Sequence, residues 1–251
     1  MEWEEPAIIL ATAPQGEGDL LATLLTPRGA WRGLARGGAA RARIAIWQPG
    51  NLLAARWAAR LPEQLGSFTG ELVHPAAALA MAARTPLAVL TAACALAAGA
   101  LPEREPHPQS FAALTRLLAG IDIPGLALPA LIRWELALLR ELGFGLDFSP
   151  AAGANDQLAY VSPRTGRAVT LSQAGEWRDR LLALPTFLLD ETEAEPDLPA
   201  CLDGLKLTGH FLARDVFGAR HLPLPTPRAR LYDLIADQAT GRILAGDDDA
   251  R

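Results

Sequence analysis

The first 74 residues alternate short apolar runs with polar segments rich in glycine, proline, asparagine and aspartate. Such alternation is typical of β-strands that are separated by turns. Five short strands with turns between them favour a small closed barrel. The expected strands lie at Pro6–Ala13, Leu20–Thr26, Ala30–Ala35, Leu52–Leu61 and Ser67–His74.

After residue 75 the pattern changes to segments rich in alanine and leucine, in which apolar residues recur every three or four positions. This spacing places them on one face of an amphipathic helix. The clearest case is Leu128–Leu142, which carries Leu131, Trp134 and Leu138 on one face and has Gly143 placed to end it. Further helices are expected at Ala76–Arg84, Thr85–Leu101, Gln109–Ala119, Ser172–Ala183, Leu198–Val216 and Pro227–Ala236.

Residues 146–171 break the helical pattern. Within them an apolar run, Leu158–Val161, is followed by a turn with proline and glycine and by a second short apolar run, Ala168–Thr170. This order predicts a β-hairpin. We therefore expect an α+β protein. Residues 1–75 would form a five-stranded β-barrel, and 76–251 an α-helical domain with a hairpin insertion near 146–171.

The charges are unevenly distributed. The net charge of the chain is −5, yet one segment near the start holds seven arginines and no acidic residue. Acidic residues gather instead in Asp190–Asp197 and Asp247–Asp249. Such asymmetry indicates that the basic segment faces a polyanion, with phosphate as the expected contact. The arginines of this basic segment are Arg28, Arg32, Arg36, Arg41, Arg43, Arg56 and Arg60.

Three tryptophans, Trp31, Trp47 and Trp57, are interleaved with these arginines. Single-stranded nucleic acid is held by cationic grooves together with aromatic rings on which bases stack. Neighbouring residues on a strand point to opposite faces. We therefore expect Trp31 and Trp57 to fill the barrel while the adjacent arginines cover its outside. Trp47 falls in a loop, Arg41–Gln48, and is the better candidate for stacking.

Signatures of enzymes and metal sites are absent from the sequence. There is no glycine-rich phosphate loop followed by Lys-Ser or Lys-Thr and no Gly-x-Ser-x-Gly motif. The four histidines have no ligand-spaced His or Cys neighbours. We expect no catalytic residues, no cofactor and no metal.

Nothing in the sequence indicates a membrane or secretory protein. The longest uncharged stretch, Thr85–Leu101, falls short of the roughly 20 apolar residues that a spanning helix needs, and it is interpreted as a buried helix. The two cysteines, Cys94 and Cys201, lie far apart and do not suggest a disulfide framework. A cytoplasmic location is expected.

Several runs in the same order along the chain resemble the RecO family of bacterial recombination mediators. The first half carries Gly33–Gly38, which is similar to the Gly-Leu-Ala-Arg/Lys-Gly segment of that family. The second half carries a helix that ends in Leu-Gly-Phe, followed by a Tyr-Val-Ser-Pro hairpin. The matching runs are Ala7–Leu10, Gly16–Asp19, Leu24–Thr26, Gly33–Gly38, Gln48–Leu52, Leu65–Phe68, Arg133–Phe144 and Tyr160–Val169.

The resemblance implies an N-terminal OB fold, a helical domain and a role in DNA repair and homologous recombination. It implies binding to single- and double-stranded DNA, strand annealing and recombinase loading with RecR and the single-strand binding protein SSB, without a cofactor. Many members hold zinc through four cysteines around the hairpin. Here Ser149–Gly153 and Ala168–Leu171 contain no cysteine, so we expect no structural zinc, and hairpin packing must replace it.

A surface for the C-terminal tail of SSB would combine a hydrophobic pocket with a cationic rim. Arg133 and Arg140 lie two turns apart on one helical face, beside Leu136 and Phe144, and these four residues are the candidates. The alternative is an ordinary surface stripe.

Other functions stay open from the residues alone. The chain could be an OB-type module that binds RNA or another nucleic acid, or a protein scaffold in which the arginines pair with the acidic half. It could also be an enzyme whose site assembles from residues far apart in sequence.

Overall fold

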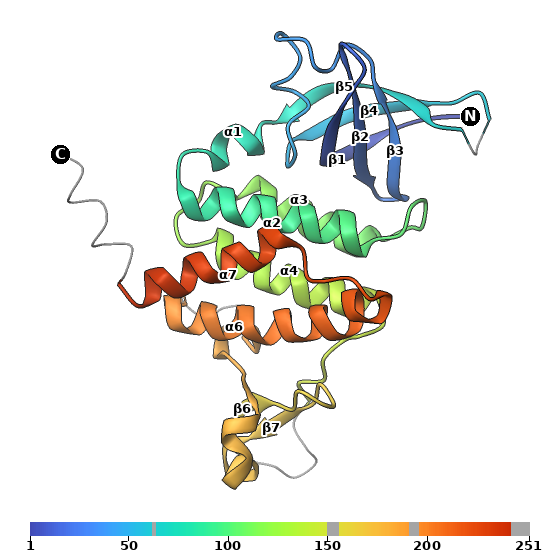
Figure 1. Ribbon diagram of the computed structural model, residues 1–251. Helices are drawn as coiled ribbons and strands as arrows, with labels where there is room; N and C mark the ends of the chain where they lie inside the picture. The colour runs from blue at the N-terminus through green and yellow to red at the C-terminus, as the bar shows by residue number, and fades with distance from the viewer. Residues whose placement is uncertain (62–63, 150–155, 191–195, 242–251) are drawn as a thin grey trace, which may run out of the picture. The chain divides into compact units, whose positions relative to one another are not determined.

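The computed structural model describes residues 1–61, 64–149, 156–190 and 196–241 (Figure 1). The chain folds as two compact units, residues 1–127 and 128–251. The first unit contains the β-barrel together with three helices. The second contains further helices and a small β-sheet.

The barrel confirms the five expected strands. They close in the order β1-β2-β3-β5-β4, in which β3 and β5 are parallel and the other pairs are antiparallel. This is the small closed barrel that the alternating pattern predicts, and it has the OB fold that the resemblance implies. β1 is long enough to pair with both β4 and β2, and its register shifts between Ile9 and Ala11. The strands are β1 (Glu2–Gln15), β2 (Asp19–Thr26), β3 (Gly29–Ala35), β4 (Leu52–Ala58) and β5 (Gly66–His74).

Aromatic side chains fill one end of the barrel. The ring centroids of Trp31 and Trp57 are 4.9 Å apart, and Trp3 stacks on Trp57 at 6.2 Å. The Trp57 indole N–H donates to the Arg32 carbonyl oxygen at 3.2 Å. Trp31 is 6% exposed and Trp57 0%, which confirms that both point inward. Gly66 leaves room for them, because a Cβ at that position would lie 2.1 Å from the Trp57 ring.

Small residues bring the helices of the first unit close to the barrel. Ala92, Ala93 and Ala97 of α2 are completely buried, and α2 contacts β1. Asn51 joins the barrel to α1, since its side-chain oxygen accepts from the Ala77 backbone N–H at 3.0 Å. The helices are α1 (Ala76–Ala80), α2 (Arg84–Ala100) and α3 (Pro108–Ala119).

Helix α4 of the second unit shows the predicted amphipathic face. Leu131, Trp134 and Leu138 are at most 2% exposed. The helix closes at Gly143, whose φ of +88° lets its N–H donate to the Arg140 carbonyl oxygen. The regular helices of this unit are α4 (Ala127–Glu141), α5 (Leu171–Ala174), α6 (Leu198–Phe211) and α7 (Thr226–Ala239). Short 3-10 or π turns are η1 (Gly175–Arg180), η2 (Thr186–Leu188), η3 (Leu212–Phe217) and η4 (Gly218–Arg220).

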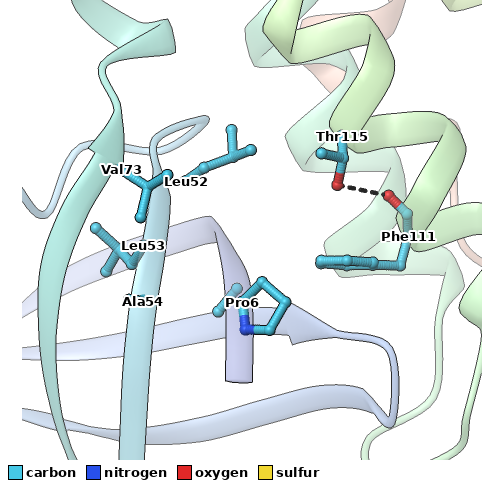
Figure 2. Close-up of a pocket in the computed structure, with 8 residues that line it drawn as sticks. Pro6, Leu52, Leu53, Ala54, Val73, Phe111 and Thr115 are labelled. Atoms are coloured by element: carbon cyan, nitrogen blue, oxygen red, sulfur yellow. Dashed lines mark hydrogen bonds between the residues drawn. The ribbon is translucent and has the colours of Figure 1, made fainter. Parts of the chain in front are cut away.

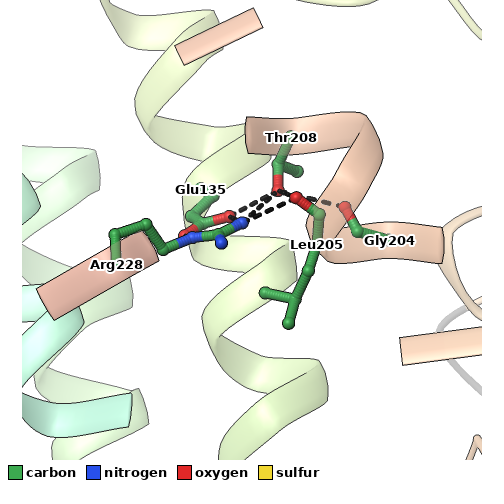
Figure 3. A network of polar contacts seen from close by, with 5 residues as sticks. All are labelled: Glu135, Gly204, Leu205, Thr208 and Arg228. Carbon is green, nitrogen blue, oxygen red and sulfur yellow. Dashed lines mark hydrogen bonds and ion pairs between the residues drawn. The ribbon is translucent and has the colours of Figure 1, made fainter. Parts of the chain in front are cut away.

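A buried ion pair joins α4, α6 and α7 (Figure 3). Arg228 is 1% exposed, and its Nε donates to the Oε1 of Glu135, which is 0% exposed, at 2.5 Å. A second guanidinium nitrogen donates to the Leu205 carbonyl oxygen at 2.8 Å, and the Thr208 hydroxyl donates to Glu135. Both charges therefore have partners, as buried charges require.

The predicted hairpin is present as part of a three-stranded sheet in the order β7-β6-β8. Its strands are β6 (Leu158–Val161), β7 (Ala168–Thr170) and β8 (Leu182–Ala183). The helix expected at Ser172–Ala183 is wrong for most of its length, because α5 ends at Gly175 (φ +44°) and Leu182–Ala183 pair with β6. The hairpin turn is held by His210 and Arg214, which both donate to the Pro163 carbonyl oxygen.

Candidate nucleic-acid interface

All seven arginines of the basic segment are exposed on the first unit. Arg28 lies in the β2–β3 turn, Arg32 projects outward from β3 and Arg56 projects outward from β4. Arg60 follows β4. The remaining three, which we call the loop arginines, lie in the connection between β3 and β4 (residues 36–51). The loop arginines are Arg36, Arg41 and Arg43.

Three of the seven arginines, Arg28, Arg32 and Arg56, are already paired with carboxylates of the same unit. The hydrogen bond and charge of Arg56 lower the pKa of Glu2, and the same hydrogen bond raises the pKa of Arg56. All three guanidinium groups are solvent-exposed, so these pairs are screened by water and salt. The pairs are Arg28–Glu5, Arg32–Glu103 and Arg56–Glu2, with N–O distances of 2.5, 3.7 and 2.5 Å.

The loop arginines and Arg60 differ from these three. Among the described residues, none of the four forms an ion pair with a carboxylate. Arg43 instead donates to the Arg36 carbonyl oxygen at 3.3 Å, which brings two of the loop arginines together. Within the described part of the chain, the charges of these four arginines are therefore not balanced by a paired carboxylate.

The backbone of the β3–β4 loop, which carries the loop arginines, is fixed by hydrogen bonds. The Gly37 N–H donates to Asp19 Oδ1 at 2.8 Å, and the Ala39 N–H donates to the Gly18 carbonyl oxygen at 3.1 Å. Both contacts attach the loop to the β1–β2 turn. A helical turn follows, in which the Ile44 N–H donates to the Ala40 carbonyl oxygen at 2.9 Å. The loop arginines thus stand on a structured support.

Trp47 does not supply the stacking surface that the sequence suggested. Its side chain is 4% exposed and packs in the barrel core with Trp3 and Trp57. A base needs access to a ring face in order to stack. The interpretation of Trp47 is therefore corrected, and its role is to anchor the β3–β4 loop to the barrel.

The outer face of β2 and β3 continues from the loop. Arg32 lies opposite Thr23, and the half-buried Leu34 lies opposite Leu21. In OB folds the face of strands 2 and 3, together with the loops that follow strands 1 and 4, binds oligonucleotides. Arg36 directly follows β3, so the loop arginines begin where this face ends.

Arg104 is a further cation that sequence reasoning missed. Its guanidinium carbon lies 5.2 Å from the Trp31 ring centroid and 5.9 Å from that of Trp57. Its backbone N–H donates to the Ala30 carbonyl oxygen at 2.8 Å, and its φ of +62° bends the connector towards β3. Arg104 lies far from the basic segment in sequence, and no local pattern marks it.

The four residues of the second unit that were candidates for the SSB tail are only partly exposed. Arg133 is half-buried, donates to the Phe187 carbonyl oxygen at 3.1 Å and lies over the Phe187 ring at 5.2 Å. Leu136 is half-buried, while Arg140 is exposed and Phe144 is 40% exposed. Arg133 therefore contributes to internal packing, and a rim at this place would depend on Arg140.

The first unit also contains an apolar cavity of about 380 Å³ between the barrel strands and α3 (Figure 2). The one polar side chain of its lining is Thr115, whose hydroxyl donates to the Phe111 carbonyl oxygen at 2.9 Å. Such a lining offers no acid, base or nucleophile. The lining residues are Pro6, Ala7, Leu52, Leu53, Ala54, Val73, Phe111 and Thr115.

Metal-ligating groups do not converge in the part of the chain that the structure describes, which holds no cluster of three or more His, Cys, Asp or Glu. Burial raises the pKa of the Cys94 thiol to about 12, which keeps it protonated. A protonated thiol is a poor nucleophile and a poor ligand. Across the same residues, no helix has the length and apolar character needed to span a membrane.

A closed five-stranded barrel with exposed cations on one loop and one face defines an OB-type protein. Comparison with known families agrees with this description. The family model for the N-terminal part of Recombination protein O matches residues 1–76, and that for its C-terminal part matches residues 82–222. The chain belongs to the RecO family.

Relatives match the chain over nearly its whole length. The DNA repair protein RecO of Acidiphilium cryptum is 64% identical over 256 residues, which cover 100% of each chain. That of Granulibacter bethesdensis is 55% identical over 94% of this chain and 96% of its own. That of Gluconacetobacter diazotrophicus is 54% identical over 98% of this chain and 100% of its own.

Proposed function

We propose that this protein is a DNA repair and homologous recombination mediator that binds single- and double-stranded DNA through the β3–β4 loop and the outer face of β2 and β3. The observation that carries the proposal is the contrast among the exposed arginines. Arg36, Arg41, Arg43 and Arg60 have no carboxylate partner among the described residues, whereas Arg28, Arg32 and Arg56 are ion-paired.

The uncompensated arginines would act by neutralising phosphates. Each phosphate contact releases condensed counterions, which contributes affinity without reading the base sequence. Lowering the charge of two complementary strands allows them to approach and anneal. This action consumes no cofactor and needs no catalytic residue. The cytoplasm is the compartment in which such a protein would meet chromosomal DNA.

RecR and the C-terminal tail of SSB complete the proposal as protein partners. For the SSB tail, Arg140 and Phe144 are the exposed members of the candidate set, and Leu136 and Arg133 are half-buried. An acidic tail with apolar end residues would pair with the Arg140 guanidinium and pack on the Phe144 ring. An Arg140→Glu variant should lose binding of an SSB tail peptide while its DNA affinity stays unchanged.

The test of DNA binding uses fluorescence anisotropy of a labelled oligo(dT) and of a labelled duplex at several salt concentrations. The loop variant is Arg36→Ala, Arg41→Ala and Arg43→Ala combined. If all three arginines contact phosphate, the slope of log K against log salt should flatten by about 0.7 × 3, or roughly 2, on single-stranded DNA. RNA of the same length serves as competitor, and tighter binding of RNA than of DNA would favour the RNA-binding alternative.

The matched control removes two ion-paired arginines away from the proposed face, as Arg28→Ala and Arg56→Ala combined, and its slope change per arginine removed is compared with that of the loop variant. These guanidiniums must first leave a carboxylate, so the control should flatten the slope less per arginine than the loop variant does. Equal slope changes per arginine for the two variants would show that the loop is not the preferred contact. Absence of DNA binding by the wild-type protein at low salt would overturn the proposal.

A further inference from the structure

The small sheet of the second unit is built around β6 (Figure 1). Aromatic and guanidinium side chains lie close together on β6 and on η1. The guanidinium carbon of Arg178 lies 5.8 Å from the Tyr160 ring centroid, and that of Arg180 lies 5.1 Å from the Trp177 ring centroid. We call these four residues the hairpin patch.

Trp177 is exposed to a degree that separates it from every other tryptophan of the chain. Its exposed fraction is 61%, whereas none of the other five exceeds 6%. Leu171, at 53%, is exposed in the same segment. A large apolar ring held in water contributes little to folding, and exposed apolar groups rimmed by polar ones are typical of binding surfaces.

The backbone of η1 (Gly175–Arg180) accounts for the position of this ring. Side chains three residues apart eclipse one another in a 3-10 helix, so Arg180 lies over Trp177. With one ring face covered by a guanidinium and 61% of the side chain in solvent, the other face is accessible. Arg178 points to a different side of the same turn and covers Tyr160 on the central strand of the sheet.

The local charge favours an anionic partner. Between residues 158 and 180 there are four arginines and two carboxylates. Arg164 is exposed on the hairpin turn of the same sheet, whereas Arg167 pairs with Asp147 at 3.8 Å. Accessible aromatic faces next to guanidinium groups are the combination with which proteins hold single-stranded nucleic acid.

We propose that the hairpin patch is a second contact surface for single-stranded DNA. One unpaired base stacks on the open face of Trp177, and Arg178 and Arg180 pair with the flanking phosphates. A duplex keeps its bases stacked inside, so only single strands use the ring. The inference rests on the proposed function for the nature of the ligand. It adds a site in the second unit that distinguishes single-stranded from double-stranded DNA.

The first experiment follows tryptophan fluorescence of the full-length protein during titration with oligo(dT). Since Trp177 is the one exposed tryptophan of six, acrylamide-accessible emission reports on it. Binding of oligo(dT) should quench this component and protect it from acrylamide, and a duplex of equal length should not. In a Trp177→Phe variant the accessible component should be missing.

The second experiment measures affinities by anisotropy. Trp177→Ala should weaken binding of oligo(dT) at least about fivefold, the lower end of what base–aromatic stacking contributes. Trp177→Phe should restore most of that loss, and duplex affinity should not change. Arg178→Ala with Arg180→Ala should flatten the salt slope on oligo(dT) by about 0.7 × 2, or roughly 1.4. The matched control, Arg116→Ala with Arg230→Ala, removes two exposed arginines elsewhere and should leave the slope unchanged.

The outcomes separate this inference from the proposed function. If the loop variant weakens DNA binding while Trp177→Ala has no effect and Trp177 stays accessible in the complex, the proposed function stands and the hairpin patch is overturned. An equal loss on single strands and duplex would also overturn it, because stacking requires unpaired bases. If the wild-type protein binds neither form of DNA, both proposals fail together.

Discussion

The basic segment of the first unit and the helix contact of the second unit use arginine in opposite ways. In the first unit, all seven arginines of the basic segment are exposed, and the barrel interior is filled by aromatic and aliphatic side chains. In the second unit, Arg228 is 1% exposed and joins three helices through Glu135. The difference shows that arginine content does not by itself identify a binding surface. An arginine is available to a ligand only where the fold leaves it in water and without a carboxylate partner.

Breaking the buried pair should produce the largest effect on stability. Arg228→Ala leaves the Glu135 charge buried without its main partner, which should lower the free energy of unfolding by about 3–5 kcal/mol. Urea unfolding measures this change. Arg230→Ala, two residues further along the same helix and exposed, should change stability by less than about 0.5 kcal/mol. A loss for Arg228→Ala no greater than for Arg230→Ala would contradict a structural role for the pair.

A smaller effect is expected from crowding the aromatic interior of the first unit. In Gly66→Ala the new methyl would lie 2.1 Å from the Trp57 ring, so the ring or β5 must move. Such overpacking costs about 1–3 kcal/mol. Gly18→Ala is the control, because a Cβ at Gly18 has no neighbour within 4 Å. Urea unfolding followed by tryptophan emission compares the two variants, and equal midpoints would show that the barrel end is loosely packed.

The smallest effect concerns an exposed carboxylate of the second unit. Hydrogen bonds from Ser172 lower the pKa of Asp156 from 3.8 to about 2, and its backbone partner is the Ser172 N–H at 2.8 Å. Because the folded-state pKa is depressed, the stabilisation is present above pH 4 and is lost as the pH falls towards 2. Asp156→Asn should remove this part of the acid dependence. An NMR titration of the carboxyl carbon checks the pKa directly, and a value near 3.8 would contradict the contact.

The sequence was most informative about the barrel. Alternating apolar residues located all five strands, and the inward position of Trp31 and Trp57 followed from the alternation of a strand. It was least informative between α5 and β8, where a helix was expected. The pairing of Leu182–Ala183 with β6 is a contact between segments about 20 residues apart, and local spacing does not encode it.

The sequence predicted the candidate site as one continuous basic segment, but the fold separates its arginines, within the described residues, into ion-paired and unpaired ones. The run of arginines without an acidic neighbour was visible in the chain, but the carboxylates that pair with three of them come from elsewhere. Glu5 and Glu2 lie on β1, and Glu103 follows α2. The loop position of Trp47 suggested exposure, yet the hydrophobic effect places its ring in the core. The exposure of Trp177 depends on a 3-10 turn that no sequence motif predicts.

The sequence by itself determined the β-then-α order of elements, the alternation that fills the barrel, the family resemblance and the concentration of positive charge near Arg28–Arg60. These properties depend on residues close together in the chain. Only the tertiary structure decided which charges are compensated, that Arg104 lies over Trp31, and that Arg228 is buried while Arg36 is not. The physical reason is that burial and ion pairing are properties of neighbours in space, and folding brings those neighbours from distant parts of the sequence.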